Sequence, residues 1–336
     1  MKRQTKRVTT YSTWAASSDL TPVDLPREGL ITEIGIRAAI TASAAQTTNQ
    51  PDSLRRVIQN LKIEGDGGRT FLGLSGEQAA RLLAFLNIYE LSSPLHTLID
   101  AAAESQSFIF HPGSNPKNPF DLTAAIPAKA LSTLQAKITT TANSVLDDVL
   151  TISSGIYYYW INQVLDVLVP AGLMVPLGST LVWPHDANYS DFSKEIDIPA
   201  GAFLRRILIL VQDETGTRPV RKDDEVTGVK VRKPKTGEMV MEARWEDLKA
   251  DIAARCGVMG ANLQVADTVS GHLNLPDGFA IIDLRKYADP LYGLDLRDYQ
   301  TGDYKLGLTI ENHTAGDDTL IYWDQLLPVE NQYVGK

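Results

Sequence analysis

The stretch VDLPREGLITEIGI at residues 23–36 returns as IDIPAGAFLRRILI at residues 196–209. In both copies Asp and Pro alternate with apolar residues ahead of an apolar run, so Asp24 and Pro26 correspond to Asp197 and Pro199. Asp-x-Pro is typical of turns, and the run that follows has the residues of a β-strand. A repeat decides the architecture of the whole chain. The pair of stretches therefore predicts one structural unit that occurs twice.

A second pair of matching segments follows in the same order. NLKIEGDGGRTFLGLSGEQAARLLAFL at residues 60–86 parallels GVKVRKPKTGEMVMEARWEDLKADIAARC at residues 228–256. The two matches are separated by 173 and 168 residues, so loops differ in length while the order of elements stays the same. A weaker match pairs Tyr159-Trp160 with Tyr322-Trp323. We expect an N-terminal arm at residues 1–19, a first unit at 20–172 and a second unit at 173–336.

Strands dominate both expected units. Residues 30–40 alternate between apolar and polar side chains, as in a strand with one face in the core and the other in water. The same period of two occurs at residues 56–63, 239–243 and 304–311. Residues 203–211 are apolar on both faces apart from Arg205 and Arg206. This last segment predicts a strand covered on both sides, by the other copy or by a neighbouring subunit.

Helices are expected at few places. Ser75 to Gln78 has the form of a capping box, and leucines follow it at helical spacing through Leu86. The matching segment of the second copy predicts a helix from Trp245 that ends near Gly257. Residues 127–150 also have helical spacing, although the three threonines at 139–141 oppose it. The predicted fold is mainly β: two tandem antiparallel jelly-roll β-sandwiches, each with a short helix between strands.

Composition limits the kind of protein and its surroundings. The 336 residues carry a formal net charge of −9, which argues against sequence-specific contact with nucleic acid over the whole surface. Cys256 is the only cysteine, so neither an intrachain disulfide nor a cysteine-based zinc site can form. No apolar stretch reaches the length of a membrane span, and the N-terminus lacks the apolar block of a secretory signal. We expect a protein that is assembled inside a cell.

The first seven residues, MKRQTKR, are strongly basic in an acidic chain. Their cations are Lys2, Arg3, Lys6 and Arg7. A disordered arm of this charge is suited to contact with anionic lipid or nucleic acid. We predict that these four residues line an interior or membrane-facing surface.

Sequence motifs for catalysis or metal binding are lacking. The five histidines, among them His111, His185 and His313, are all more than ten residues apart, which excludes local metal motifs and leaves open a site built from distant histidines. The acidic cluster Asp223-Asp224-Glu225 and its neighbour Asp213-Glu214 are interpreted as solvated loops. GDGGRT at residues 65–70 is interpreted as a hairpin turn and Cys256 as a structural residue. We predict no enzyme activity and no catalytic, cofactor-binding or metal-binding residues.

The duplicated frame, the basic N-terminus and the helix that follows the hairpin at residues 60–74 together resemble a known family. TPVDLPREGLITEIGIRAAI at residues 21–40 and IDIPAGAFLRRILILV at residues 196–211 open its two copies. The chain resembles the double jelly-roll major capsid proteins of tailless icosahedral double-stranded DNA viruses, the tectivirus and adenovirus lineage. The similarity in layout extends from about residue 20 to about residue 330, and DPLYGLDLRDYQTGDYKLGLTIEN at residues 289–312 resembles the last strands of such proteins.

The resemblance implies a structural protein of the virion. Three subunits would form one capsomer, and two sandwiches in each subunit would give a nearly hexagonal trimer that can tile a shell. It further implies contacts with neighbouring capsomers, with minor capsid and vertex proteins and, through the N-terminal arm, with an anionic inner membrane. The expected host is bacterial or archaeal, as for a bacteriophage, with assembly in the host cytoplasm.

Two alternatives stay open at this point. One is a carbohydrate-binding or carbohydrate-cleaving tandem sandwich, in which Tyr157, Tyr158 and Trp160 form a platform for a sugar. The other is a minor vertex or spike protein of the same kind of virus. Glycan binding distinguishes the first alternative from a major capsid protein, and the number of copies per particle distinguishes the second.

Overall fold

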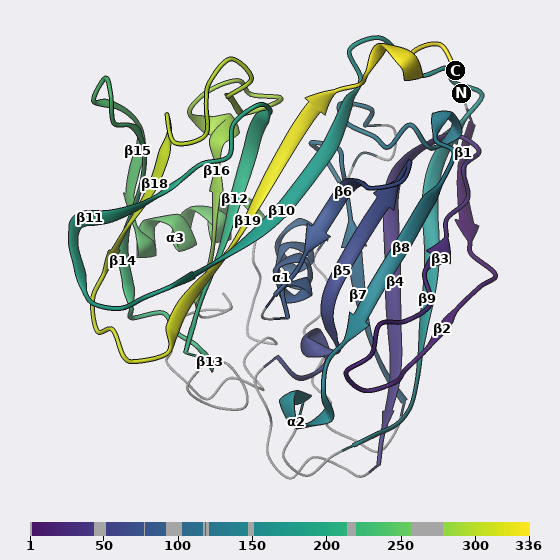
Figure 1. Ribbon diagram of the computed structural model, residues 1–336, viewed down its shortest axis with the longest axis horizontal. Coiled ribbons are helices and arrows are strands. Elements are labelled where there is room, and N and C mark those ends of the chain that lie inside the picture. Colours follow the sequence, from purple (N-terminus) through teal and green to yellow (C-terminus); the bar gives the residue numbers. More distant parts are fainter. Residues whose placement is uncertain are drawn as a thin grey trace. The chain divides into compact units, whose positions relative to one another are not determined.

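The computed structural model describes residues 2–43, 52–76, 78–91, 103–116, 118, 121–146, 151–213, 220–256 and 278–336. These residues form antiparallel sheets with few helices (Figure 1). The chain divides into two compact units. The first consists mainly of Met1–Ser179 and Leu327–Lys336, and the second mainly of Thr180–Gly260 and His272–Leu326.

The first unit contains two four-strand paths, β1-β9-β4-β7 and β3-β8-β5-β6, and the short β2 also pairs with β9. Most connections take the chain from one sheet to the other, which is the strand order of a jelly roll. The strands are β1 (Lys2–Arg7), β2 (Ser12–Thr13), β3 (Val23–Asp24), β4 (Leu30–Ala42), β5 (Ile58–Gly65), β6 (Arg69–Leu74), β7 (Ala103–Phe110), β8 (Leu134–Thr140) and β9 (Ile152–Leu165). The helices are α1 (Ala80–Leu91) and α2 (Asn143–Leu146), with short 3₁₀ turns at Ser53–Arg56 and Ala128–Ala130.

The second unit repeats this order. Its sheets are β11-β18-β14-β15 and β10-β19-β12-β13, and β16 and β17 also pair with β12. The strands are β10 (Met174–Pro184), β11 (Tyr189–Asp197), β12 (Phe203–Asp213), β13 (Val220–Arg221), β14 (Val226–Lys233), β15 (Glu238–Arg244), β16 (Phe279–Asp283), β17 (Leu294–Asp295), β18 (Lys305–Ile310) and β19 (Asp317–Pro328). The helix α3 spans Trp245–Cys256, and a short 3₁₀ turn lies at Leu284–Lys286. A further 3₁₀ turn near the C-terminus, Asn331–Tyr333, belongs to the first unit.

The predicted fold class, two tandem jelly rolls, is confirmed, and the Asp-x-Pro repeat occupies equivalent places in both. Asp24 ends β3 and lies opposite Gln135 of β8, whose Nε2 donates to its Oδ1 over 2.9 Å. Asp197 ends β11 and lies opposite Lys305 of β18, whose Nζ is 3.1 Å from its Oδ1. The repeat therefore marks the turn that takes the chain from one sheet to the other.

Both rolls contain a β-bulge after this turn. The register of β4 on β9 shifts between Ile31 and Glu33, and that of β12 on β19 shifts between Leu204 and Arg206. These positions are related by the same separation of 173 residues as the first sequence match. A bulge inserts one residue and redirects the side chains beside it. Each roll therefore presents polar side chains from the same place in its sheet.

The predicted match of Tyr159-Trp160 with Tyr322-Trp323 is wrong by one residue. Tyr159 lies opposite Ile36, whereas the residue opposite the equivalent Ile209 is Ile321. Because strand side chains alternate between faces, a shift of one residue exchanges inside and outside. Tyr159 is buried in the first roll, and Trp323 is the one of the second pair that belongs to the core of the second roll.

Predictions for the helices have mixed outcomes. The helix at residues 245–256 is confirmed as α3, although the side chains of Ile252 and Cys256 lie outside the described residues. The first helix begins at Ala80 rather than next to Ser75, because Gly76 and Gln78 have φ values of 85° and 50° that a right-handed helix does not allow. The helix considered at residues 127–150 is wrong. Its central part forms β8, where Thr139 and Thr140 fit the pleated sheet, and only Asn143–Leu146 is α-helical among the described residues of the segment.

The N-terminal segment is a strand rather than a free arm. Residues 2–7 pair with Leu165 to Trp160 of β9 along their whole length. Apolar alternation did not predict this strand, because an edge strand exposes much of its surface and can carry charged residues at most positions. The first roll therefore begins at Lys2 and not at residue 20. Between the rolls, β9 ends at Leu165 and β10 begins at Met174.

The strand predicted to be covered on both sides is confirmed as buried. In β12 every residue from Phe203 to Gln212 is buried. Alternate residues, such as Leu204, Ile207 and Ile209, belong to the core between the two sheets of the second roll. Among the described residues, no helix combines the length and the apolar character that a bilayer crossing requires.

Candidate functional site

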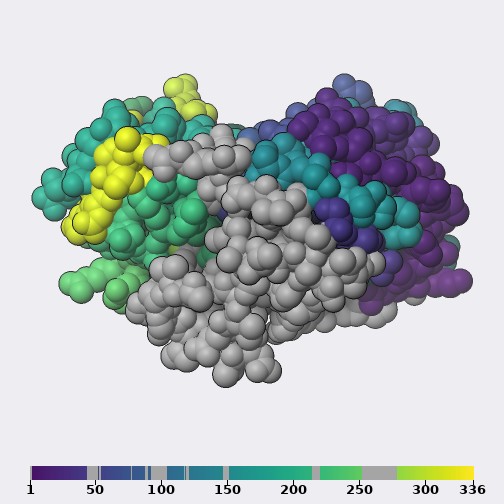
Figure 2. Space-filling view, turned by 90° about the horizontal axis from the view of Figure 1, so that it is seen from below, coloured from purple at the N-terminus to yellow at the C-terminus, as the bar shows by residue number. Residues whose placement is uncertain are grey.

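The four predicted surface cations lie on the edge strand β1 and are divided between its two sides. Arg7 lies opposite Trp160 and Lys6 opposite Ile161, so the two side chains point to different faces of the sheet. Lys6 forms an ion pair with Glu28. Lys2 and Arg3 are exposed, and the purple N-terminal part of the chain lies at the surface in Figure 2. The structure thus does not present the four cations as one flexible group.

Arg7 belongs to an aromatic and basic patch on the outer face of the β1-β9-β4-β7 sheet. The guanidinium carbons of Arg7 and Arg37 each lie 5.0 Å from the centre of the Tyr158 ring, within the range of cation–π attraction. An open hollow of about 330 Å³ is lined by Arg7, Arg37, Tyr158, Tyr159 and Trp160.

The predicted sugar platform is not formed in this sheet. Tyr157 is completely buried, and its hydroxyl donates to the carbonyl of Val57 over 3.1 Å. Tyr158 points to the opposite face, where two guanidiniums contact its ring. Trp160 is partly buried. Alternation along β9 prevents the three aromatic side chains from forming one exposed surface.

The bulge of the first roll holds a half-buried carboxylate, Glu33, with contacts to both of its oxygens. Glu33 Oε1 accepts from Trp160 Nε1 over 3.1 Å and from Asn162 Nδ2 over 2.7 Å. Glu33 Oε2 lies 2.7 Å from Nε2 of His111, which directly follows β7. Burial acts to raise the pKa of Glu33, but the bonds from His111 and Trp160 and the charge of Arg3 lower this pKa below its ordinary value.

The equivalent bulge of the second roll has the opposite sign of charge. Asp324 Oδ2 accepts from Arg205 Nε over 2.9 Å and from Arg206 Nε over 2.6 Å, and Arg205 Nη2 reaches Oδ1 over 3.0 Å. Both arginines reach one carboxylate because the bulge brings consecutive residues to the same partner. Burial opposes the charged form, yet the two guanidiniums hold the pKa of Asp324 at about 2. Burial and the nearby Asp324 raise the pKa of Tyr322 far above its usual range.

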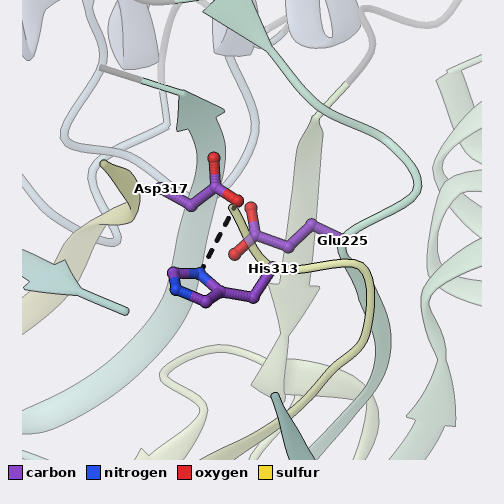
Figure 3. A group of neighbouring side chains, drawn as sticks. All are labelled: Glu225, His313 and Asp317. Atoms are coloured by element: carbon purple, nitrogen blue, oxygen red, sulfur yellow. Dashed lines mark ion pairs between the residues drawn. The ribbon is translucent and has the colours of Figure 1, made fainter. Parts of the chain in front are cut away.

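A third cluster, in the second roll, brings together Glu225, His313 and Asp317 (Figure 3). Glu225 precedes β14, His313 lies between β18 and β19, and Asp317 begins β19. One ligand atom from each residue lies within 4.8 Å of the other two. His313 Nδ1 is 3.7 Å from Asp317 Oδ2.

Neighbouring side chains hold the two carboxylates of this cluster in place. Glu225 Oε1 is hydrogen-bonded to Nδ1 of His185, whose Nε2 is 3.0 Å from the hydroxyl of Thr319. Lys222 Nζ lies 2.7 Å from Asp317 Oδ1. Burial raises the pKa of Glu225 above its ordinary value, although the bond to His185 lowers it. This is the reverse of the direction found for Glu33.

The sequence did not reveal this cluster. The interpretation of residues 223–225 as a solvated loop is wrong for two of them: Glu225 is completely buried, and Asp223 accepts from Trp245 Nε1 over 2.8 Å. His185 and His313 are distant in sequence and come together only through the jelly-roll connections. His313 and Asp317 are four residues apart, which is a local signal for part of the cluster, but Glu225 lies 88 residues before His313. His96 and His272 lie outside the described residues.

Solved structures share the architecture of the whole chain. The atomic structure of Sulfolobus turreted icosahedral virus matches with a TM-score of 0.73 at 16% identity, over 98% of this chain and 91% of that chain. The crystal structure of the major capsid protein of the same virus matches with a TM-score of 0.71 at 17% identity, over 98% and 97% of the two chains. The PBCV-1 virus capsid matches with a TM-score of 0.63 at 10% identity, over 97% and 93%.

The chain matches no protein-family model and no curated protein sequence. At these low identities the similarity to the solved structures concerns the fold. The chain has the double jelly-roll fold that these structural viral capsid proteins share.

Proposed function

We propose that this double jelly-roll chain is the major capsid protein of an icosahedral virus. The observation that carries the proposal is a shared fold over nearly the full length of both chains: 98% of this chain and 97% of the capsid protein to which it is compared. A structural role also agrees with the sequence, which contains no motif for catalysis.

The trimeric capsomer follows from a physical argument. Two similar sandwiches in one chain give six similar bodies around a three-fold axis, so a trimer can occupy a nearly hexagonal position in a shell. The partners are then two further copies of the chain, neighbouring capsomers, and minor capsid and vertex proteins. Assembly is proposed to take place in the host cytoplasm.

The solution mass tests the trimer. The full chain has a mass of 36.8 kDa, so light scattering behind a sizing column is expected to give roughly 110 kDa for a trimer. Electron microscopy of that fraction should then show particles with a pseudo-hexagonal outline. A stable monomer under all conditions that allow particle assembly would contradict the proposal. A monomer that binds a glycan array would instead favour a carbohydrate-binding protein.

We further propose that β1 faces an anionic inner membrane. Lys2, Arg3 and Arg7 are exposed. Arg7 contacts the ring of Tyr158 and Lys6 pairs with Glu28, which leaves Lys2 and Arg3 as the cations best placed to meet a lipid surface. Each exposed cation contributes about 1 kcal/mol near an anionic bilayer at moderate salt.

Vesicle flotation tests this orientation. The chain should float with phosphatidylserine vesicles and not with neutral ones, and Lys2→Glu with Arg3→Glu should abolish flotation. Lys129→Glu with Lys235→Glu serves as a control of equal charge change, because both lysines are exposed and lie outside β1. Equal loss in the two double variants would indicate an effect of net charge alone and would contradict a membrane-facing β1.

A further inference from the structure

We propose that Glu225, His313 and Asp317 form a binding site for a divalent transition-metal ion of the Zn²⁺ class in the second jelly roll. The inference does not depend on the capsid role. It rests on the placement of the three side chains, on two buried atoms that lack hydrogen-bond partners, and on the charge of the cluster.

The placement is that of a preformed site. Figure 3 shows the Glu225 carboxylate, the His313 ring and the Asp317 carboxylate turned toward one another. Their ligand atoms lie within 4.8 Å of one another. Zinc bonds of about 2.0–2.2 Å to nitrogen and oxygen require ligand atoms about 3.4 Å apart, so a contraction on the order of 1 Å completes the site. His313 is the least buried of the three, with 15% of its side chain exposed, and has the most freedom to move.

Two buried atoms of this group make no hydrogen bond among the described residues. Glu225 Oε2 has no hydrogen-bond partner among the described residues, and its side chain is completely buried. His313 Nδ1 is likewise buried without a hydrogen bond in the described part of the chain. Buried polar atoms are nearly always satisfied by a partner, a water or an ion. Two exceptions beside each other and beside a second carboxylate therefore indicate a common ligand.

The charges of the cluster favour a cation. Glu225 and Asp317 bring two carboxylates, and Lys222 supplies one ammonium group at 2.7 Å from Asp317 Oδ1. Lys222 is also 3.9 Å from Asp213 Oδ2, so its charge is shared with a further carboxylate. A buried carboxylate is stable when it is paired or when it coordinates a metal. Lys222 neutralises the Asp317 side of the cluster, while the group hydrogen-bonded to Glu225 is the imidazole of His185.

The donor set selects the class of metal. One imidazole nitrogen and two carboxylate oxygens suit zinc and neighbouring transition ions, whereas Ca²⁺ and Mg²⁺ prefer six or more oxygen ligands. The surrounding contacts resemble an outer shell that fixes metal ligands. His185 is bonded to Glu225 Oε1, and the backbone N–H of Thr314 donates to Asp317 Oδ2 over 2.6 Å. An ion here would join the start of β14 to the connection between β18 and β19.

The test measures binding to the full-length chain. After dialysis against EDTA, titration calorimetry with ZnCl₂ is expected to show one ion per chain, and thermal unfolding of the zinc-loaded chain is expected to occur at higher temperature. CaCl₂ at the same concentration should bind at least ten times more weakly. Absence of stoichiometric zinc binding to the wild-type chain would overturn the proposal and leave Lys222 as the permanent counter-ion.

Variants assign the binding to these residues. His313→Ala removes a partly exposed ligand and is expected to weaken zinc binding about 100-fold, while its unfolding in EDTA stays like that of the wild type. Asp186→Asn is the control, because Asp186 is an exposed acid near His313 that lies outside the cluster. Glu225→Gln retains the shape of the side chain and a contact with His185 but loses the charge, and it should weaken binding similarly. Zinc binding as tight in His313→Ala as in the wild type would overturn the assignment.

Discussion

The bulges of β4 and β12 lie at equivalent places in the two rolls, but the side chains that they carry have opposite charge. In the first roll the bulge holds Glu33, which accepts hydrogen bonds from neutral groups and from His111. In the second roll it holds Arg205 and Arg206, which share the carboxylate of Asp324. Glu33 and Arg206 lie opposite Asn162 and Asp324 at equivalent positions of the two sheets.

The difference shows which property the duplicated fold requires. The backbone must bulge at this point, and the redirected side chains must find polar partners when they are buried. The charge of the bulge residue differs between the two rolls, and the residue opposite it differs with it: Asn162 lies opposite Glu33, and Asp324 lies opposite Arg206. The fold therefore determines the geometry of each buried group, and the local partners determine its chemistry.

The largest effect is expected from breaking the charged pair of the second roll. Asp324→Asn removes the charged carboxylate that the two buried guanidiniums share and should lower the free energy of unfolding by about 3–5 kcal/mol. Urea denaturation followed by tryptophan fluorescence measures it. A loss below about 1 kcal/mol would show that other groups satisfy both arginines.

The second effect is a dependence of stability on acid that arises in the second roll. The pKa of Asp324 is about 2 in the folded chain and near 3.8 in the unfolded chain, so its contribution is complete above pH 3.8 and is lost as the pH falls toward 2. The loss is about 2 kcal/mol. Denaturation curves between pH 5 and pH 2 should show it in the wild type and lack it in Asp324→Asn. Equal acid sensitivity of both proteins would contradict the assignment.

A smaller loss is expected at the bulge of the first roll. Glu33→Gln retains one carbonyl oxygen for Trp160 and Asn162 but loses the charge that favours the bond to His111, at a cost of about 1–2 kcal/mol. The same urea experiment measures it. If Glu33→Gln lowered the free energy of unfolding as much as Asp324→Asn does, the prediction that the charged pair of the second roll contributes more stability than the Glu33 contacts would be wrong.

The smallest effect is expected at the Asp-x-Pro turns beside the bulges. Asp24→Ala removes a bond to Gln135, and Asp197→Ala removes a half-exposed ion pair with Lys305, so each should cost at most about 1 kcal/mol. Raising the salt concentration should reduce the cost of Asp197→Ala, because Asp197 forms an ion pair with Lys305. It should leave the cost of Asp24→Ala unchanged, because the partner of Asp24 is the neutral amide of Gln135. An equal salt response at both sites would contradict this distinction.

The sequence by itself determined the duplication, the main strands and the helix at residues 245–256. Repeated turn residues and the alternation of apolar side chains are patterns within short stretches of sequence, so one sequence is enough to recognise them. The wrong predictions for residues 2–7 and 127–150 have the same origin, because they also relied on short sequence patterns. The edge strand β1 depends on backbone pairing rather than on apolar residues, and β8 has the spacing of a helix but pairs with β3 and β5.

Tertiary structure alone decided the chemistry of the buried groups. Glu225, His313 and Asp317 lie up to 92 residues apart, and only the connections of the second roll bring their side chains within 4.8 Å. The partners of Glu33 likewise lie 78 to 129 residues away, and those of Asp324 lie 118 and 119 residues away. The charge state of a buried carboxylate depends on what surrounds it in space, and strand pairing between distant segments determines those surroundings.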